Sequence, residues 1–208
     1  TRPESLELYR PMTNDPRLQR ALNAHRAGNL EEAARLYSDL LRVQPANFDA
    51  LYLLGYVHLQ RREFVQAARL MGVAQQVNPR ALDAIYNRGR ALKELERYEE
   101  ALVCFQQLTS INPAVPEGWA AQGKLLLDLG RHVEAVHSLN AAVAQNPAMS
   151  DVWNNRGNAL TALGGLEEAL QSYDKSLALE FRVETLNNRG NALFALNRFE
   201  ESAQDFSR

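Results

Sequence analysis

The chain has 208 residues, of which 46% are hydrophobic and 23% are charged, and its formal net charge is −2. Arginine is common but interleaved with glutamate, so no basic stripe marks a phosphate-backbone footprint and we expect no nucleic-acid partner. No apolar stretch approaches the roughly 20 residues that a membrane span needs, and no signal peptide is visible, so we expect a cytoplasmic protein. The single cysteine, Cys104, cannot form an intramolecular disulfide and fits a reducing compartment.

Residues 1–13 form an N-terminal extension that lies outside the repeat register described below. Pro3, Pro11 and Pro16 confine any helix there to a short piece around Glu4–Arg10. Such a piece would either cap the first repeat or serve as a linker, and the sequence leaves both readings open.

From residue 14 onward, a 34-residue period runs through the chain. It carries three residue types at three phases: Pro45, Pro79, Pro113 and Pro147; Gly55, Gly89, Gly123 and Gly157; and Ala33, Ala67, Ala101, Ala135 and Ala169. A fixed period of this length predicts an array in which each repeat copies one supersecondary element. We place six repeats at 14–47, 48–81, 82–115, 116–149, 150–182 and 183–208, the last one truncated.

Each repeat is predicted to contain two helices, and the fourth repeat shows why. Trp119, Gly123 and Leu126 occupy positions 4, 8 and 11, the i, i+4, i+7 spacing of one helical face. Ala135 and Leu139, at positions 20 and 24, begin the same spacing on a second helix. Small residues at positions 8 and 20 let the two antiparallel helices approach closely, and large residues at positions 4, 11 and 24 fill the space around the crossing.

Breaker residues separate the helices of each repeat. Gly28, Gly130 and Gly164, at position 15, break the chain between the first and the second helix. Proline at position 32 cannot continue a helix and ends the second one. The fifth repeat lacks one residue and carries Phe181 where proline is expected, so we expect its junction to pack differently.

The pattern W-x2-L-G-x2-Y, A-x3-F and P resembles the tetratricopeptide repeat. The clearest matches are residues 153–160 (WNNRGNAL), 166–173 (LEEALQSY) and 98–105 (YEEALVCF). The resemblance covers residues 14–208 and implies an all-α fold, a right-handed α-α superhelix of about six helix-turn-helix repeats. It also implies a protein-interaction scaffold that binds a peptide or protein partner in its concave groove, which positions 2, 5, 6, 9, 12 and 13 of the first helices line.

On this resemblance, a set of tyrosine, asparagine and basic residues lines the partner-binding groove: Tyr52, Tyr56, Tyr86, Asn87, Arg90, Lys124, Asn154, Asn155, Asn158, Asn187, Asn188 and Asn191. Asparagine is a poor helix former, so helix propensity did not select the asparagines. A side-chain amide both donates and accepts hydrogen bonds and can hold an extended peptide backbone without reading its sequence. Hydrogen bonds between neighbouring repeats explain the asparagines equally well, and both hypotheses stay open here.

Acidic residues recur at position 2 of every repeat: Asp15, Asp49, Asp83, Glu117, Asp151 and Glu184. Each falls at the start of a first helix, where negative charge suits the helix dipole. We therefore interpret them as structural rather than as part of a binding site.

No catalytic constellation is visible, so we predict that the chain is not an enzyme and binds no metal or cofactor. His25, His58, His132 and His137 are scattered, and His132 and His137 do not share one helical face. Phosphate-loop, C-x-x-C and G-x-S-x-G motifs do not occur. We interpret the histidines as half-buried structural residues.

A second hypothesis concerns the asparagines at position 6. Asn87, Asn155 and Asn188 match the phase at which O-linked N-acetylglucosamine transferases and their SPINDLY relatives carry an asparagine ladder that holds substrate peptide. This resemblance implies the substrate-presenting arm of a larger O-linked glycosyltransferase, with the catalytic domain outside this chain. Leu53 and Ala121 interrupt the ladder.

The sixth repeat stops at Arg208, before the final turns of its second helix, which begins at about Phe199. Stacked repeats need a terminal repeat with a polar outer face, and none follows. We therefore expect Leu193, Phe199 and Phe206 to be partly open. The chain would then be a fragment of a longer protein, or it would self-associate through its C-terminal repeat, or the residues after about Phe199 would be poorly ordered.

Overall fold

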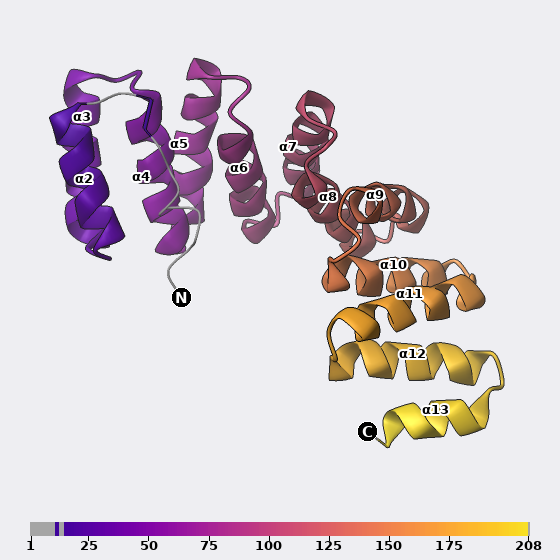
Figure 1. The fold of residues 1–208 in the computed structure, drawn as a ribbon. Coiled ribbons are helices and arrows are strands. Elements are labelled where there is room, and N and C mark those ends of the chain that lie inside the picture. The colour runs from indigo at the N-terminus through magenta and orange to yellow at the C-terminus, as the bar shows by residue number, and fades with distance from the viewer. Residues whose placement is uncertain (1–10, 13–14, 208) are drawn as a thin grey trace. The chain divides into compact units, whose positions relative to one another are not determined.

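The structure is a computed structural model that describes residues 11–12 and 15–207, so the proposed helix around Glu4–Arg10 lies outside the described residues. Within the described ranges it contains twelve α-helices and no strand (Figure 1). The helices are α2 (Pro16–Arg26), α3 (Leu30–Val43), α4 (Phe48–Gln60), α5 (Phe64–Val77), α6 (Leu82–Glu94), α7 (Tyr98–Ile111), α8 (Pro116–Asp128), α9 (His132–Gln145), α10 (Ser150–Ala162), α11 (Leu166–Leu179), α12 (Val183–Ala195) and α13 (Phe199–Phe206).

The predicted all-α fold of helix-turn-helix repeats is confirmed. The second helices of the first five repeats, α3, α5, α7, α9 and α11, each have 14 residues and start 34 residues apart. The second helix ends two residues before each recurring proline, because the residue that precedes a proline is held in extended backbone. The first helix α2 starts at Pro16, with the Asp15 side chain accepting a hydrogen bond from the Arg17 backbone N–H at 2.8 Å.

The helices form two compact units, Thr1–Gln107 and Leu108–Arg208, whose boundary falls inside α7. In the first unit, consecutive helices from α2 to α6 pack on one another, and the first helices α2, α4 and α6 also contact each other in turn. In the second unit, α8 to α13 pack in the same pattern, and α8, α10 and α12 contact each other. Each unit therefore carries a face built from the first helices of its repeats.

The close crossing inside each repeat joins position 8 of the first helix to position 24 of the second. A Cβ added to Gly89 would lie 2.7 Å from the Phe105 ring, and one added to Gly123 would lie 2.6 Å from Leu139 Cγ. Gly157 meets the ring of Tyr173 in the same way. Only a hydrogen atom fits at these positions, so the glycines bring a large side chain of the second helix onto the backbone of the first.

We predict that Gly123→Leu lowers the free energy of unfolding by about 1–3 kcal/mol or more, because the added side chain collides with Leu139 and with its backbone nitrogen. Chemical denaturation checks this, and the transition should also broaden because a neighbour-coupled array loses cooperativity around the damaged repeat. An unfolding curve that overlays the parent would contradict the assigned crossing.

The chain turns between the two helices of every repeat through a residue with positive φ. The glycines at this position, Gly28, Gly130 and Gly164, have φ of +83°, +71° and +80°. Arg62, Glu96 and Asn197 take the same place in the other repeats, with φ of +60°, +58° and +60°. In each case the following backbone N–H donates to a carbonyl five residues back, as Arg131 does to Leu126 at 2.9 Å, which caps the first helix.

Substitutions at these turns should separate backbone strain from packing. A Cβ at Gly130 would meet no atom within 4 Å, so Gly130→Ala should cost only the left-handed conformation, about 1–2 kcal/mol of unfolding free energy. Glu96→Gly should act in the opposite direction and by less, because glycine also has more freedom in the unfolded chain. Thermal melts of both variants measure this, and opposite signs are the required result.

The junction after the fifth repeat differs from the proline-containing junctions. At two of the latter, the indole Nε1–H of Trp119 and of Trp153 donates to the carbonyl oxygen of Pro113 and of Pro147, each at 2.9 Å. At residues 180–182, where Phe181 replaces proline, charged and polar groups take over. Arg182 pairs with Asp151 and with Glu180, and Ser150 Oγ donates to Glu180 at 2.9 Å.

The expectation for the last repeat is partly wrong. Leu193 is buried, because it packs against Leu170 and Tyr173 of the preceding second helix and does not depend on a following repeat. The helix α13 is formed from Phe199 to Phe206, and both of these rings are about half exposed, at 52% and 51%. The exposed large apolar side chains of α13 are therefore these two phenylalanines, and Leu193 is not exposed with them.

Candidate functional site

In the first compact unit, the predicted anchors Tyr52 and Tyr56 are buried. The Tyr52 ring stacks on Phe48 and Tyr56 at centroid distances of 6.1 and 6.3 Å. Its hydroxyl accepts a hydrogen bond from Asn87 Nδ2 at 3.2 Å, and burial raises the pKa of Tyr52. Tyr52 and Asn87 thus join α4 to α6, so part of the proposed groove set serves the packing of neighbouring first helices.

The rest of the first-unit set lies on α6 and reaches solvent. Tyr86 is half-buried and Arg90 is exposed, with the guanidinium 6.0 Å from the Tyr86 ring centroid. Arg90 Nη1 also donates to Asn87 Oδ1 at 3.1 Å. These contacts fix the orientation of Arg90 and leave its charge at the surface.

In the second compact unit, one group of asparagines is used by the fold. Asn188 Nδ2 donates to Asn154 Oδ1 at 3.1 Å, which links α12 to α10. The Tyr173 hydroxyl donates to Asn158 Oδ1 at 2.9 Å, which links α11 to α10. Asn154 is buried. For these residues, hydrogen bonding within the array accounts for the asparagine.

The side-chain amides of a second group, Asn155, Asn187 and Asn191, make no hydrogen bond to any residue that the structure describes. Asn187 and Asn191 are exposed on α12, and Asn155 is half-buried on α10. Lys124, on α8, is engaged with Asp128, with Nζ 2.6 Å from Oδ1. The asparagines therefore divide into a bonded set and a set whose amides remain available.

Sequence reasoning missed the arginines at position 7, Arg88, Arg156 and Arg189. Each extends from a first helix toward the second helix of the preceding repeat, where Arg156 Nε donates to Asn140 Oδ1 at 2.6 Å and Arg189 Nη1 to Asp174 Oδ1 at 2.6 Å. Their spacing of 68 and then 33 residues, two repeats and the one shortened repeat, is the signal that could have found them.

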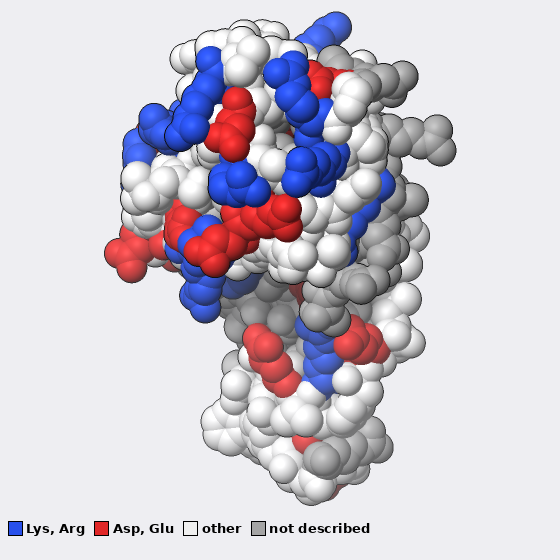
Figure 2. Space-filling view, turned by 90° about the vertical axis from the view of Figure 1, so that its left-hand side faces the viewer, with Lys and Arg blue, Asp and Glu red and all other residues white. Residues whose placement is uncertain are grey.

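Charged side chains elsewhere on the surface are mixed in sign. On the face drawn in Figure 2, basic and acidic side chains lie next to one another without forming a single-sign stripe. Arg97, for example, donates to both carboxylate oxygens of Glu100 at 2.7 and 2.8 Å, and this bidentate contact lowers the pKa of Glu100. Such pairs at helix starts are typical of a solvated helix surface.

His25 is buried on α2 in a polar pocket. Its Nε2 lies 2.8 Å from Gln60 Oε1, and its Nδ1 lies 3.4 Å from the Tyr37 hydroxyl. Burial lowers the pKa of His25, an effect that the Gln60 contact opposes. The folded state therefore favours the neutral form of His25.

We predict that the free energy of unfolding falls as the pH drops below about 6.5, because the unfolded chain then binds a proton at His25 more readily than the folded chain does. The stability that neutral His25 contributes is fully present above the pKa of the unfolded chain and is lost as the pH falls through the lowered pKa of the folded state. Denaturation of the parent and of His25→Gln across this range checks it. The variant should show the shallower pH dependence, and equal slopes would contradict the assignment.

Two features are absent from the part of the chain that the structure describes. No group of three or more histidine, cysteine, aspartate or glutamate side chains there is arranged to hold a metal ion. Among the same residues, no helix combines the length and the apolar character that crossing a membrane requires.

Known families match most of the chain. Residues 86–137 and 120–180 match the family model described as tetratricopeptide repeat. Residues 26–108 match the model described as anaphase-promoting complex, cyclosome, subunit 3. No curated protein sequence matches the chain.

Solved structures with similar folds include the following three proteins. YrrB, described as a TPR protein with an unusual peptide-binding site, is 23% identical at a TM-score of 0.75, over 89% of this chain and 92% of YrrB. A tetratricopeptide repeat protein from Parabacteroides merdae is 17% identical at 0.78, over 92% and 76%. MamA from Desulfovibrio magneticus RS-1 is 20% identical at 0.71, over 84% and 91%. At these identities the likeness establishes the fold.

Proposed function

Because residues 86–137 and 120–180 match the tetratricopeptide-repeat family and the fold is that of such proteins, we propose that the chain is a scaffold that binds an extended segment of another protein on the first-helix face of its second compact unit. The observation that carries the proposal is the unbonded set of Asn155, Asn187 and Asn191 on adjacent helices. Position 5, 6 and 9 asparagines weaken helices, and these three gain no hydrogen bond within the described fold in return.

The chemistry of this face suits a peptide main chain. Each amide offers two donor hydrogens and an acceptor oxygen, so it can pair with both the N–H and the C=O of an extended segment. The bond between Asn188 and Asn154 holds α12 beside α10, and therefore sets the spacing of the free amides before any partner arrives. A preorganised face loses less side-chain entropy on binding.

The glycosyltransferase-arm hypothesis gains no specific support. Of the three position-6 asparagines, Asn87 donates to Tyr52 and Asn188 to Asn154, so two of the three are used within the array. The matching family models are of tetratricopeptide repeats and of an anaphase-promoting complex subunit. Binding without catalysis is therefore the function that we propose.

Self-association through the C-terminal repeat stays a prediction. The exposed rings of Phe194, Phe199 and Phe206 support it, because clustered apolar side chains on a surface commonly mark an association site. Phe194 and Phe199 already contact each other edge to face, with ring centroids 5.2 Å apart.

The proposal is tested by selecting peptides from a display library of unstructured sequences with the parent chain. Replacing Asn155, Asn187 and Asn191 together by alanine should lower the affinity for the selected peptides by about tenfold or more, because each lost amide hydrogen bond contributes about 0.5–1.5 kcal/mol to binding. Helicity and melting should stay near the parent values, since these amides make no hydrogen bond within the described fold.

The matched control is Glu167→Ala with Gln171→Ala, which removes two exposed side chains of the second helix α11 and should leave binding unchanged. If the peptides bind the asparagine variant as tightly as the parent but bind the control variant more weakly, binding takes place on the second-helix face and the proposal is overturned.

A further inference from the structure

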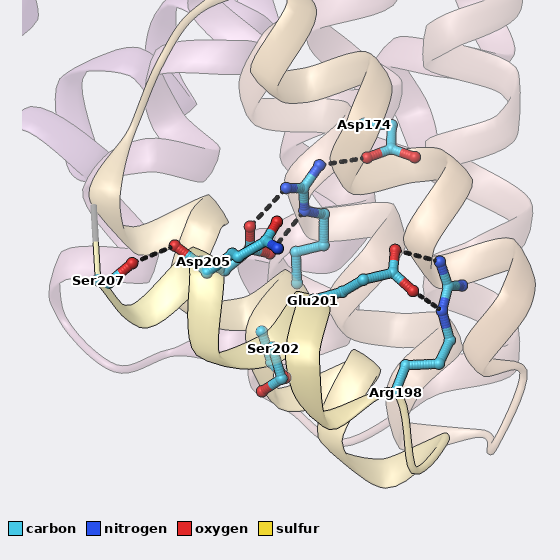
Figure 3. Close-up of polar contacts among 9 residues, drawn as sticks. Asp174, Arg198, Glu201, Ser202, Asp205 and Ser207 are labelled. Carbon is cyan, nitrogen blue, oxygen red and sulfur yellow. Dashed lines mark hydrogen bonds and ion pairs between the residues drawn. The ribbon is translucent and has the colours of Figure 1, made fainter.

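The position-7 arginines differ in how many of their guanidinium donors have hydrogen-bond partners. In the fifth and sixth repeats, neighbouring side chains satisfy the guanidinium. Asp174 of the preceding repeat and Asp205 of the same repeat, both labelled in Figure 3, accept hydrogen bonds from Arg189, with Asp205 oxygens 2.7 and 2.6 Å from Nε and Nη2. Asn140 and Ser172 play these two parts for Arg156, at 2.6 and 2.5 Å.

In the third repeat, the equivalent partners are missing. Asn140 and Asp174 occupy position 25 of the repeats that precede Arg156 and Arg189, but Gly72 occupies this position before Arg88. Ser172 and Asp205 occupy position 23 of the same repeats as Arg156 and Arg189, but Cys104 occupies it in the repeat of Arg88. Glycine supplies no acceptor. Burial raises the pKa of the Cys104 thiol, which therefore remains a neutral and weak acceptor.

Arg88 is left with an unsatisfied donor as a result. Its Nη1 donates to Gln75 Oε1 at 2.9 Å, but its Nε is buried without any hydrogen-bond partner. A buried donor without an acceptor carries a desolvation cost, and in most native structures such a donor is paired. The unpaired Nε is therefore a donor that an acceptor from outside the fold would satisfy.

The surroundings of Arg88 can receive that acceptor. A hollow of about 460 Å³ between α5 and α6 is lined by Arg88, Arg69, Gly72 and Gln76 among others. Arg69 is exposed and forms no ion pair with any described residue. The nearby carboxylate of Glu100 accepts hydrogen bonds from Nε and Nη2 of Arg97 instead of from Arg88. Two guanidinium groups thus face one hollow.

Gly72 defines where the ligand would sit. A Cβ added to Gly72 would lie 3.5 Å from Arg88 Nε and 3.9 Å from Nη2, which is ordinary van der Waals contact. The structure therefore accommodates a Cβ beside the Arg88 guanidinium, at the repeat position from which Asp174 reaches Arg189 in the last repeat.

We infer that the α5–α6 hollow is a second binding site, which takes the carboxylate of an aspartate side chain of a bound protein between Arg88 and Arg69. The incoming carboxylate replaces the acceptor that Asp174 provides to Arg189, and it forms charge-assisted hydrogen bonds with a fixed fork of donors. This site belongs to the first compact unit, whereas Asn155, Asn187 and Asn191 belong to the second, and it does not depend on the proposed function.

The test follows the Arg88 Nε–Hε resonance by NMR while the chain is titrated with the blocked peptide acetyl-Gly-Asp-Gly-amide. We expect a saturable shift at Arg88, and no such shift with acetyl-Gly-Asn-Gly-amide, which has the same shape without the charge. The Arg156 resonance, already bonded to Asn140, should stay unchanged.

Two substitutions at one residue make the test specific. Gly72→Asp supplies the carboxylate from within and should weaken the aspartyl peptide at least tenfold, whereas Gly72→Ala makes the same change to the helix without an acceptor and should leave binding intact. An absent shift, an equal response to the asparaginyl peptide, or undiminished binding to Gly72→Asp would each overturn the inference. A response to inorganic phosphate without one to the aspartyl peptide would overturn it too.

Discussion

The structure depends on one close contact, in which a large side chain at position 24 lies directly on the backbone of a glycine at position 8. Each of these contacts locks two helices at one separation, as Leu139 does on Gly123 and Phe105 on Gly89. Since the contact recurs from the second repeat to the sixth, the first helix of each of these repeats is placed in the same way against its own second helix. Residues at positions 5, 6 and 9 therefore gather on one face of each compact unit, and that face is what the chain can offer to a partner.

Much of this fold follows from phase alone. The glycines, alanines and prolines at fixed steps predicted the helix pairs because each has one dominant steric effect. The position of a residue within the repeat predicted its conformation less well where the backbone adopts dihedral angles that are unfavourable for that residue type. Arg62 and Glu96 adopt positive φ, a conformation that sequence reasoning reserves for glycine, and only their place in the repeat reveals it.

The candidate site was harder to predict, because residues on one face differ in depth. Asn154 and Asn155 are adjacent in sequence, yet Asn154 is buried and bonded to Asn188 while Asn155 is left half-buried and free. Tyr52, predicted to line the groove, is buried and stacks on Phe48 and Tyr56. Helical phase gives direction but not burial, which depends on the neighbouring repeat. The loss of a partner from a recurring hydrogen-bond network, as Gly72 removes one from Arg88, becomes visible only when the contacts of equivalent arginines in different repeats are compared.

The most direct measurement of the central claim is the set of intermolecular nuclear Overhauser effects in a complex of the chain with a selected peptide. If the first-helix face of the second compact unit holds an extended segment, the side-chain amide protons of Asn155, Asn187 and Asn191 will show contacts to the main-chain protons of the peptide. Contacts found only from α9, α11 and α13, with none from those amides, would contradict the account.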